Sequence, residues 1–341
     1  MSDTATIAID AMGGDYGPSE TVRGAVQAAR AGNVTVLLVG DEAEVQQALA
    51  AQDAAGLPIK VIPSEGTIVE GEHPAKALRS KPKSSIAVSV GLVKQGVADA
   101  FVSMGSTGAS MAASVFMLGK FPGLDRPTLG GPFIGLAPTT TIIDLGANVD
   151  CKPAQLLNFG ALGASFQRFY LGFNDVRVGL LSVGSEEGKG NRQVQEAFDL
   201  FKASGLNFVG NVEGHEVFQD KADVIVCDGF VGNVLLKFTE GLAEAAARYL
   251  ASALGADSPA VKAVSGLTEA AERGGGPLFG IDGLAVVGHG RTKGEGIAAS
   301  VALAKHCLEI DLVKHMREDL AAAQERAGIS VNDGAADEGE A

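Results

Sequence analysis

The chain has 341 residues and a formal net charge of −14, and hydrophobic residues make up 46% of it. This composition is typical of a globular protein, and the negative charge argues against a nucleic-acid-binding protein, which would carry a basic face. No apolar run reaches membrane-spanning length and no signal peptide precedes the first expected strand, so the sequence predicts a cytoplasmic protein.

Short apolar runs alternate with amphipathic helical patterns. Most runs are continuously apolar, which is typical of strands covered on both faces. The alternation predicts a three-layer α/β/α sandwich with a mostly parallel sheet. The expected strands are residues 6–10, 34–39, 60–62, 100–103, 141–144, 176–183, 224–227 and 284–288. The expected helices are residues 20–31, 42–52, 85–95, 109–118, 154–169, 193–203 and 297–307.

Residues 240–273 break this rhythm and predict two helices joined near residues 255–259. Two interpretations stay open: a helical pair packed on the body, or a protruding hairpin used for dimerisation or membrane contact. We expect a single catalytic α/β/α domain over residues 1–328, with the hairpin as an insertion. Residues 329–341 are acidic and are expected to form a disordered tail.

The three cysteines, Cys151, Cys227 and Cys307, are far apart and form no CxxC pair. This pattern favours reduced thiols over disulfides or a zinc site. The five histidines show no zinc-ligand spacing, so we expect no metal.

Polar, glycine-rich turns follow six of the expected strands. The carboxyl ends of parallel strands lie at one edge of a sheet, where open α/β sheets bind ligands. Six such turns therefore predict a ligand site at that edge. They are residues 10–15, 103–108, 144–148, 184–190, 228–229 and 288–290.

The turn at residues 103–108 is the best candidate for an anion site. It reads Ser-Met-Gly-Ser-Thr-Gly and opens a helix, whose first N–H groups and dipole favour an anion. Ser106 and Thr107 add hydroxyl donors, and the glycines let the backbone approach a ligand. Alternatively, Ser106 or Thr107 caps the helix and the glycines serve packing; both interpretations can hold together.

Longer blocks of sequence carry a family resemblance. The first, at residues 9–18, contains Ile-Asp-Ala-Met-Gly-Gly-Asp followed by Gly17-Pro18. Together with the later blocks it resembles the phosphate acyltransferases of bacterial phospholipid synthesis, over nearly the whole chain before the tail. The later blocks are residues 77–79, 103–109, 144–153, 184–190, 210–214 and 227–234.

The resemblance implies transfer of a fatty acyl group from acyl carrier protein to inorganic phosphate, giving acyl phosphate for phospholipid synthesis. It implies a homodimer, a fold like those of phosphotransacetylase and isocitrate dehydrogenase, and no cofactor. It also implies loose association with the inner face of the membrane, near a membrane glycerol-phosphate acyltransferase that takes the product.

Two turns depart from the family pattern. Ser106 stands where the family usually carries Asn, which keeps a polar group but changes the geometry of the turn. Arg291 and Thr292 follow His289-Gly290 where the family tends to have two serines, and Arg291 either strengthens anion binding or lies in solvent.

In this chemistry phosphate is the nucleophile, so the enzyme has to position it beside a thioester and stabilise an oxyanion. Lys189 is the candidate that supplies positive charge, or it is an ordinary exposed lysine. We expect phosphate to be bound by the hydroxyls of Ser106 and Thr107 and by the backbone of Gly105 and Gly108.

The other candidate site residues follow from the same turns. Asn148 and Asn233 are oxyanion or phosphate donors, or else turn-forming residues. His289 is the candidate acid for the departing thiolate, or a structural histidine. We expect Asp10 and Asp228 to orient Lys189 or loop N–H groups, since a carboxylate in contact with phosphate would repel it. Gly13, in the first turn, completes the substrate-binding set.

The acyl chain needs an apolar groove, which we expect at residues 116–121 or 240–273. The acidic carrier protein needs a basic patch, for which Arg79, Lys81 and Lys83 form the densest cluster; the alternative is a solvated loop.

Three competing functions can be separated by experiment. A short-chain phosphotransacylase would prefer coenzyme A thioesters. A decarboxylating dehydrogenase on the same fold would bind a nucleotide. A non-catalytic scaffold would bind the carrier protein without phosphate-dependent turnover.

Overall fold

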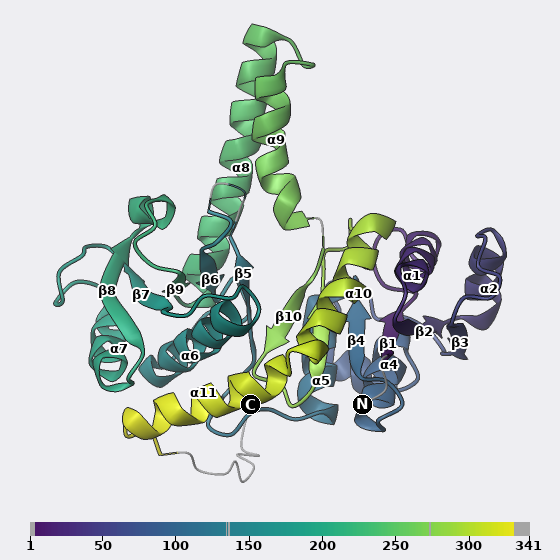
Figure 1. Cartoon of the computed structure of the whole chain (residues 1–341), viewed down its shortest axis with the longest axis horizontal. Coiled ribbons are helices and arrows are strands. Elements are labelled where there is room, and N and C mark those ends of the chain that lie inside the picture. Colours follow the sequence, from purple (N-terminus) through teal and green to yellow (C-terminus); the bar gives the residue numbers. More distant parts are fainter. Residues whose placement is uncertain (1–3, 134, 136, 273, 331–341) are drawn as a thin grey trace. The chain divides into compact units, whose positions relative to one another are not determined.

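The computed structural model describes residues 4–330 except 134, 136 and 273. The chain divides into two compact units (Figure 1): unit 1 comprises Met1–Gly119 and Glu272–Val313, and unit 2 comprises Lys120–Ala271 and Lys314–Ala341. This division does not test the expected single domain over residues 1–328, which stays a prediction. The expected tail at residues 329–341 lies, from residue 331 on, outside the described residues.

Unit 1 contains a mostly parallel sheet: among its described residues β1 pairs in parallel with β2 and β4, β2 with β3 and β4 with β11, whereas β10 and β11 are antiparallel. The strand order is β3 (Ile59–Pro63), β2 (Val34–Gly40), β1 (Ala5–Asp10), β4 (Ala100–Ser103), β11 (Leu284–Val287), β10 (Gly276–Phe279). The helices of the unit are α1 (Ser19–Ala31), α2 (Glu42–Ala50), α3 (Pro74–Ser80), α4 (Ser85–Lys94), α5 (Thr107–Met117) and α10 (Gly294–Glu309).

Helices cover both faces of the unit 1 sheet. Ala8 and Leu37 pack against Val88 and Leu92 of α4 on one face, and because side chains alternate along a strand, their neighbours face the other way. On that other side α1 packs against α10. Arg23 of α1 ties the two helices by pairing with Glu20 and with Glu295.

Unit 2 contains a second sheet, in which β5 is antiparallel to β6 and the remaining pairs are parallel. The strand order is β5 (Thr128–Pro132), β6 (Thr141–Ile143), β9 (Val224–Val226), β7 (Arg177–Ser182), β8 (Asn207–Glu213). The helices are α6 (Pro153–Phe169), α7 (Arg192–Ala203), the 3₁₀ helix η1 (Gly214–Phe218), α8 (Gly229–Leu254), α9 (Pro259–Glu272) and most of α11 (Leu312–Arg326).

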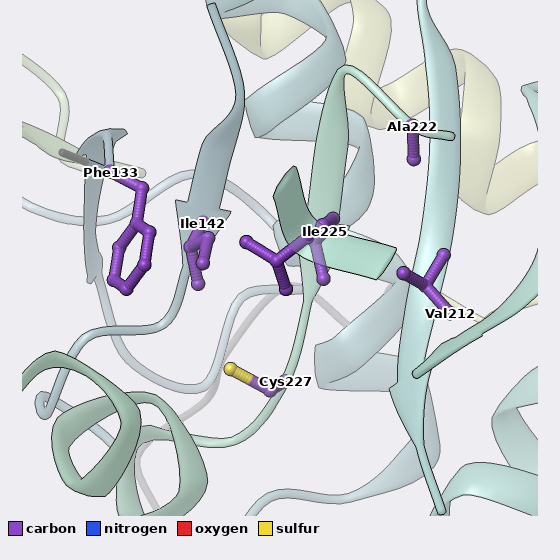
Figure 2. Close-up of a cluster of buried hydrophobic side chains, with 7 residues drawn as sticks. Phe133, Ile142, Val212, Ala222, Ile225 and Cys227 are labelled. Carbon is purple, nitrogen blue, oxygen red and sulfur yellow. The ribbon is translucent and has the colours of Figure 1, made fainter. Parts of the chain in front are cut away.

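The unit 2 sheet is also covered on both faces. Ile143 and Val224 contact α6 at Gly163. Their neighbours Ile142 and Ile225 point the other way, into a buried cluster with Phe133, Val212 and Cys227 that Leu235 and Leu236 of α8 complete (Figure 2).

Helices α8 and α9, joined by residues 255–258, form the expected helical pair and project from unit 2 (Figure 1). Of the 26 residues of α8, only Gly229, Gly232 and Ala247 are buried. This exposure favours the protruding hairpin over a helical pair packed on the body.

Helix α8 begins at Gly229, well before the expected start at residue 240. Its first turn presses against the turn that follows β6. A Cβ on Gly232 would overlap the carbonyl oxygen of Asp144, and one on Gly229 would lie 2.8 Å from the Asn148 nitrogen. The glycines therefore mark a close contact inside a helix, although in sequence they resemble a loop.

All eight expected strands and all seven expected single helices are confirmed, with boundaries that shift by a few residues. The strands that sequence reasoning missed are β5, β8 and β10. Their segments, TLGGP, NFVGNVE and GPLF, contain glycine, proline or polar residues that disguise a strand. The fold positions the carboxyl ends of the parallel strands, with their turns, at one edge of each sheet.

Replacing Gly232 by Ala tests the close contact. The added methyl has no room against Asp144, so we expect a loss of about 1–3 kcal/mol in the free energy of unfolding, measured by urea denaturation. Gly241→Ala on the same helix is the matched control, because nothing lies within 4 Å of its Cβ position. That variant should gain about 0.5–1 kcal/mol from helix propensity. Equal effects of the two substitutions would contradict the contact.

Candidate functional site

Three of the predicted turns enclose a pocket of about 480 Å³ in unit 1. They are residues 12–15 after β1, 104–107 after β4 and 288–291 after β11, three adjacent parallel strands. Residues 67–70, between β3 and α3, form the fourth wall. Sequence reasoning missed this fourth segment, because its flanking glycines, Gly66 and Gly71, stand singly and do not form a glycine-rich turn.

The buried carboxylate of Asp10 connects the turn after β1 with the turn after β4. Its carboxylate accepts hydrogen bonds from the Ser103 hydroxyl at 2.7 Å and from the Met12 N–H at 3.3 Å. Ser103 Oγ in turn accepts from the Gly105 N–H at 2.9 Å. Asp10 is 1% exposed and is not among the residues that line the pocket. Its hydrogen bonds orient the Met12 N–H directly and the Gly105 N–H through Ser103, and its expected part in substrate binding stays a prediction.

Glycines let the two turns approach each other. A Cβ on Gly13 would overlap the Asp10 carboxylate and lie 2.8 Å from the Gly105 nitrogen. Gly13 lines the pocket with its backbone alone. The Gly105 N–H is already bound to Ser103, so the predicted phosphate contact of the Gly105 backbone would have to compete with that bond.

Ser106 is the N-cap residue of α5. Its hydroxyl oxygen accepts from the Ala109 N–H at 3.3 Å, and the side chain is buried. The capping interpretation is therefore confirmed. The N–H groups of Thr107 and Gly108, in the first turn of α5, have no intrahelical acceptor and remain suited to an anion. Pro74 of α3 lies where a Cβ on Gly108 would go, so α3 abuts this helix start.

The third turn brings His289 and Arg291 to the pocket. Both side chains are exposed, and the Gly290 carbonyl accepts from the Asp15 N–H at 2.8 Å, which ties this turn to the first. The walls thus combine hydroxyls, backbone N–H groups and a guanidinium with two exposed carboxylates, Asp15 and Glu70.

In unit 2, Asp144 holds its turn much as Asp10 does. Its carboxylate accepts from the N–H groups of Gly146 and Ala147 at 3.0 and 2.8 Å, and from Nδ2 of Asn148 at 2.7 Å. Asn148 Nδ2 also donates to the Pro127 carbonyl at 2.9 Å. Both protons of this amide are therefore engaged, which fits the turn-forming role; its predicted role as an oxyanion donor stays a prediction.

Asn233 and Asp228 lie at the start of α8. Asn233 is exposed in the helix and its side chain lies against Gly146, so it is not a turn-forming residue. Asp228 caps α8 by accepting from the Val231 N–H at 2.8 Å. It therefore orients a backbone N–H group, one of the two roles expected of it.

Lys189 is exposed on the turn between β7 and α7. Asn211 of β8 supports this turn, since its Nδ2 donates to the Glu186 carbonyl at 2.9 Å and to the Lys189 carbonyl at 3.4 Å. The aliphatic part of Lys189 lies over Gly184.

The structure thus gathers Asp10, Gly13, His289 and the 103–108 turn in unit 1. In unit 2 it gathers Asn148, Asn233 and Asp228. Sequence reasoning did not single out Asp144 or Asn211. Asp144 ends an expected strand as Asp10 does, which was the available signal, whereas Asn211 lies in β8, a strand that sequence reasoning missed. Sequence reasoning also missed an apolar pocket of about 440 Å³ in unit 2.

The cysteines behave as predicted in the described chain: all three are free thiols. Burial raises the pKa of Cys151 and that of Cys307 to about 12. Burial also raises the pKa of Cys227, with the charge of Asp228 as the next cause. None is therefore a ready thiolate at neutral pH.

Comparisons with known proteins agree with this architecture. A family model described as "Fatty acid synthesis protein" matches residues 5–315. A phosphate acyltransferase of Pelotomaculum thermopropionicum is 41% identical over 324 residues, which cover 92% of this chain and 94% of that protein. Another, of Nitratidesulfovibrio vulgaris, is 42% identical over 318 residues, with 90% and 92% covered.

Among solved structures, a phosphotransacetylase from Streptococcus pyogenes matches with a TM-score of 0.61 at 18% identity, covering 90% of this chain and 95% of that one. This likeness confirms the predicted α/β fold, with a mostly parallel sheet and helices on both sides. The chain is an enzyme of the acyltransferase class. It belongs to the phosphate acyltransferase family, as the resemblance in its sequence predicts.

The buried Asp10 gives a pH-dependent prediction. Burial raises its pKa above the ordinary 3.8, outweighing the hydrogen bonds that lower it. The folded state therefore binds the proton more tightly than the unfolded state, and stability falls as the pH rises from below 3.8 through the folded pKa. Asp10→Asn removes this dependence, so the free energy of unfolding of wild type minus variant should fall with rising pH.

Urea denaturation between about pH 3 and pH 7 measures this difference. Asp199→Asn, which changes an exposed aspartate of α7, controls for the loss of one charge. A difference that rises with pH would mean that the hydrogen bonds lower the pKa of Asp10 by more than burial raises it, which would contradict the prediction.

Proposed function

We propose that this enzyme transfers a fatty acyl group from acyl carrier protein to inorganic phosphate, and that the unit 1 pocket binds the phosphate. The observation that carries the proposal is the convergence of three glycine-bearing turns and the start of α5 on one polar pocket. A helix start with unpaired N–H groups and flanking hydroxyls suits a phosphate dianion. The family membership and the names of the relatives support the same reaction.

In the proposed reaction a phosphate oxygen attacks the thioester carbonyl carbon. The new C–O bond forms, the C–S bond breaks, and the carrier protein leaves as a thiolate that takes up a proton. His289, exposed at the pocket wall, is the proposed donor of that proton. Burial raises the pKa of the Cys151 and Cys227 thiols, which disfavours a cysteine nucleophile and supports a mechanism in which phosphate itself is the nucleophile.

A basic surface beside the pocket supports an acidic carrier protein as the donor. Lys76 and Arg79 are exposed on α3, the helix whose Pro74 contacts the start of α5. The other two members of the expected cluster are engaged: Lys81 pairs with Glu72 at 2.7 Å and Lys83 with Glu65 at 2.9 Å. The proposed docking surface is therefore α3 and not the loop that follows it.

An exposed apolar stripe on α8 supports a homodimer. Val231, Val234, Phe238, Leu242 and Tyr249 are spaced by three, four, four and seven residues, so they share one helix face. They are between 38% and 74% exposed. Large exposed apolar patches mark interaction sites, and we propose that a second copy of the chain covers the outer part of this stripe.

Sedimentation equilibrium tests the dimer. The wild type should sediment as a dimer, and Leu242→Glu should raise the dissociation constant at least about tenfold, because it buries a charge in the interface. Glu244→Lys, off the stripe on the same helix, should leave it unchanged. A monomeric wild type would contradict the proposal.

The membrane association and the handover to a membrane glycerol-phosphate acyltransferase stay predictions from the resemblance. No helix in the described part of the chain combines the length and apolarity needed to span a lipid bilayer. Flotation with anionic lipid vesicles would test the association, and its absence at low salt would contradict it.

The phosphate assignment predicts the kinetics of two variants. Thr107→Val removes a hydroxyl from the pocket, and Lys189→Ala removes the positive charge that we hypothesise from the sequence to help hold phosphate. Each should raise the KM for phosphate at least about tenfold, the worth of a hydrogen bond to a charged group. Thr107→Ser should retain most of the phosphate affinity.

The readout is phosphate-dependent loss of the acyl carrier protein thioester. Lys202→Ala is the control, since Lys202 pairs at the surface with Glu187. An unchanged KM for phosphate in both test variants would remove the assignment.

A further inference from the structure

The pocket of unit 2 has the opposite chemistry to that of unit 1. It lies at the carboxyl ends of β7 and β9, between the starts of α7 and α8. Its walls are mainly aliphatic and aromatic, and Asp228 is the one charged residue among its lining residues in the described chain. A site with a carboxylate and no cation disfavours phosphate and favours an uncharged, apolar ligand.

The floor of this pocket is buried and its rim is exposed. Leu156 of α6 and Cys227 at the end of β9 are 1% and 4% exposed. Phe230 and Phe238 of α8, at the rim, are more than 60% exposed. Exposed aromatic side chains above a buried aliphatic floor form a site that an apolar ligand would cover.

The volume of the pocket discriminates between occupants. An α-helix with its side chains is about 10 Å across with a 5.4 Å pitch, so about 440 Å³ holds roughly one helical turn. A helix from a second copy would therefore span the rim without filling the hollow. A methylene group is similar in size to a water molecule, whose share of liquid volume is about 30 Å³, so the pocket has room for roughly fifteen chain carbons.

We infer that the unit 2 pocket binds the aliphatic chain of the acyl donor. The inference rests on the proposed function, because that function requires a long acyl chain to be held. It places the chain against Leu156, Val194, Cys227 and Val234, at the carboxyl edge of the unit 2 sheet. Sequence reasoning expected the groove at residues 116–121 or 240–273. The pocket contains no residue of either range, although its lining residues on α8 extend to Phe238, close to the start of the second range.

The test uses S-alkyl thioethers of pantetheine, the thiol arm shared by acyl carrier protein and coenzyme A, with 4, 8, 12 and 16 carbons. Calorimetry measures their affinity without turnover. The wild-type affinity should rise about fourfold per methylene until the pocket is full. Val194→Trp and Val234→Trp, from different helices, fill the pocket and should bind the 16-carbon thioether at least about tenfold more weakly, with the 4-carbon affinity unchanged.

Asp199→Trp places the same side chain on the exposed part of α7, outside the pocket, and should behave as the wild type. A wild-type affinity without chain-length dependence would overturn the inference. Wild-type affinity for the 16-carbon thioether in both pocket variants would also overturn the inference. If those variants changed only the sedimentation of the protein, a second copy of the chain would be the occupant of the pocket.

The outcome is separable from that of the proposed function. Phosphate-dependent loss of the thioester in the wild type reports on the reaction, whereas the thioether series reports on the chain site alone. A chain-length series that is lost in the two pocket variants supports the site even if no phosphate-dependent turnover occurs.

Discussion

A carboxylate buried at the carboxyl end of a central strand organises the turns of each unit. Asp10 and Asp144 are 1% and 0% exposed, and burial raises the pKa of both. A buried charge needs hydrogen-bond donors around it, and here the donors are the N–H and hydroxyl groups of the turns themselves. The hydrogen bonds that stabilise each aspartate therefore also hold the turns in place. In unit 1 these turns line the polar pocket, and in unit 2 the turn lies against the start of α8.

Glycine makes these arrangements possible by letting backbone segments touch. In unit 1 the contact of Gly13 with Gly105 brings two turns within reach of one carboxylate. In unit 2 Gly232 seats the start of α8 on the Asp144 turn, which sets the direction in which the helix leaves the sheet. The same helix then supplies Val234 and Phe238 to the apolar pocket. The polar and the apolar pocket are thus each a consequence of local backbone packing at a sheet edge.

Much of this could be predicted from the sequence, because strand–helix alternation and the turn at residues 103–108 are local patterns. What could not be predicted depends on tertiary partners. The Asn148 side-chain amide is a group that can donate to an oxyanion. In the structure it donates instead to the Asp144 carboxylate and to the Pro127 carbonyl. Lys81 looked available for a carrier protein, but Glu72, nine residues earlier and outside α3, forms an ion pair with it. The residues that line the apolar pocket come from several separate elements, so no single segment of the sequence predicted it.

In the proposed reaction, phosphate accepts the acyl group from a carrier protein thioester. The direct measurement incubates the wild type with ¹⁸O-labelled phosphate and a 16-carbon acyl thioester of acyl carrier protein, with the coenzyme A thioester in parallel. We expect acyl phosphate that carries the label, formed at the same rate as free carrier thiol and faster than from the coenzyme A thioester. Release of carrier thiol that is independent of phosphate, with unlabelled free fatty acid as the product, would contradict it.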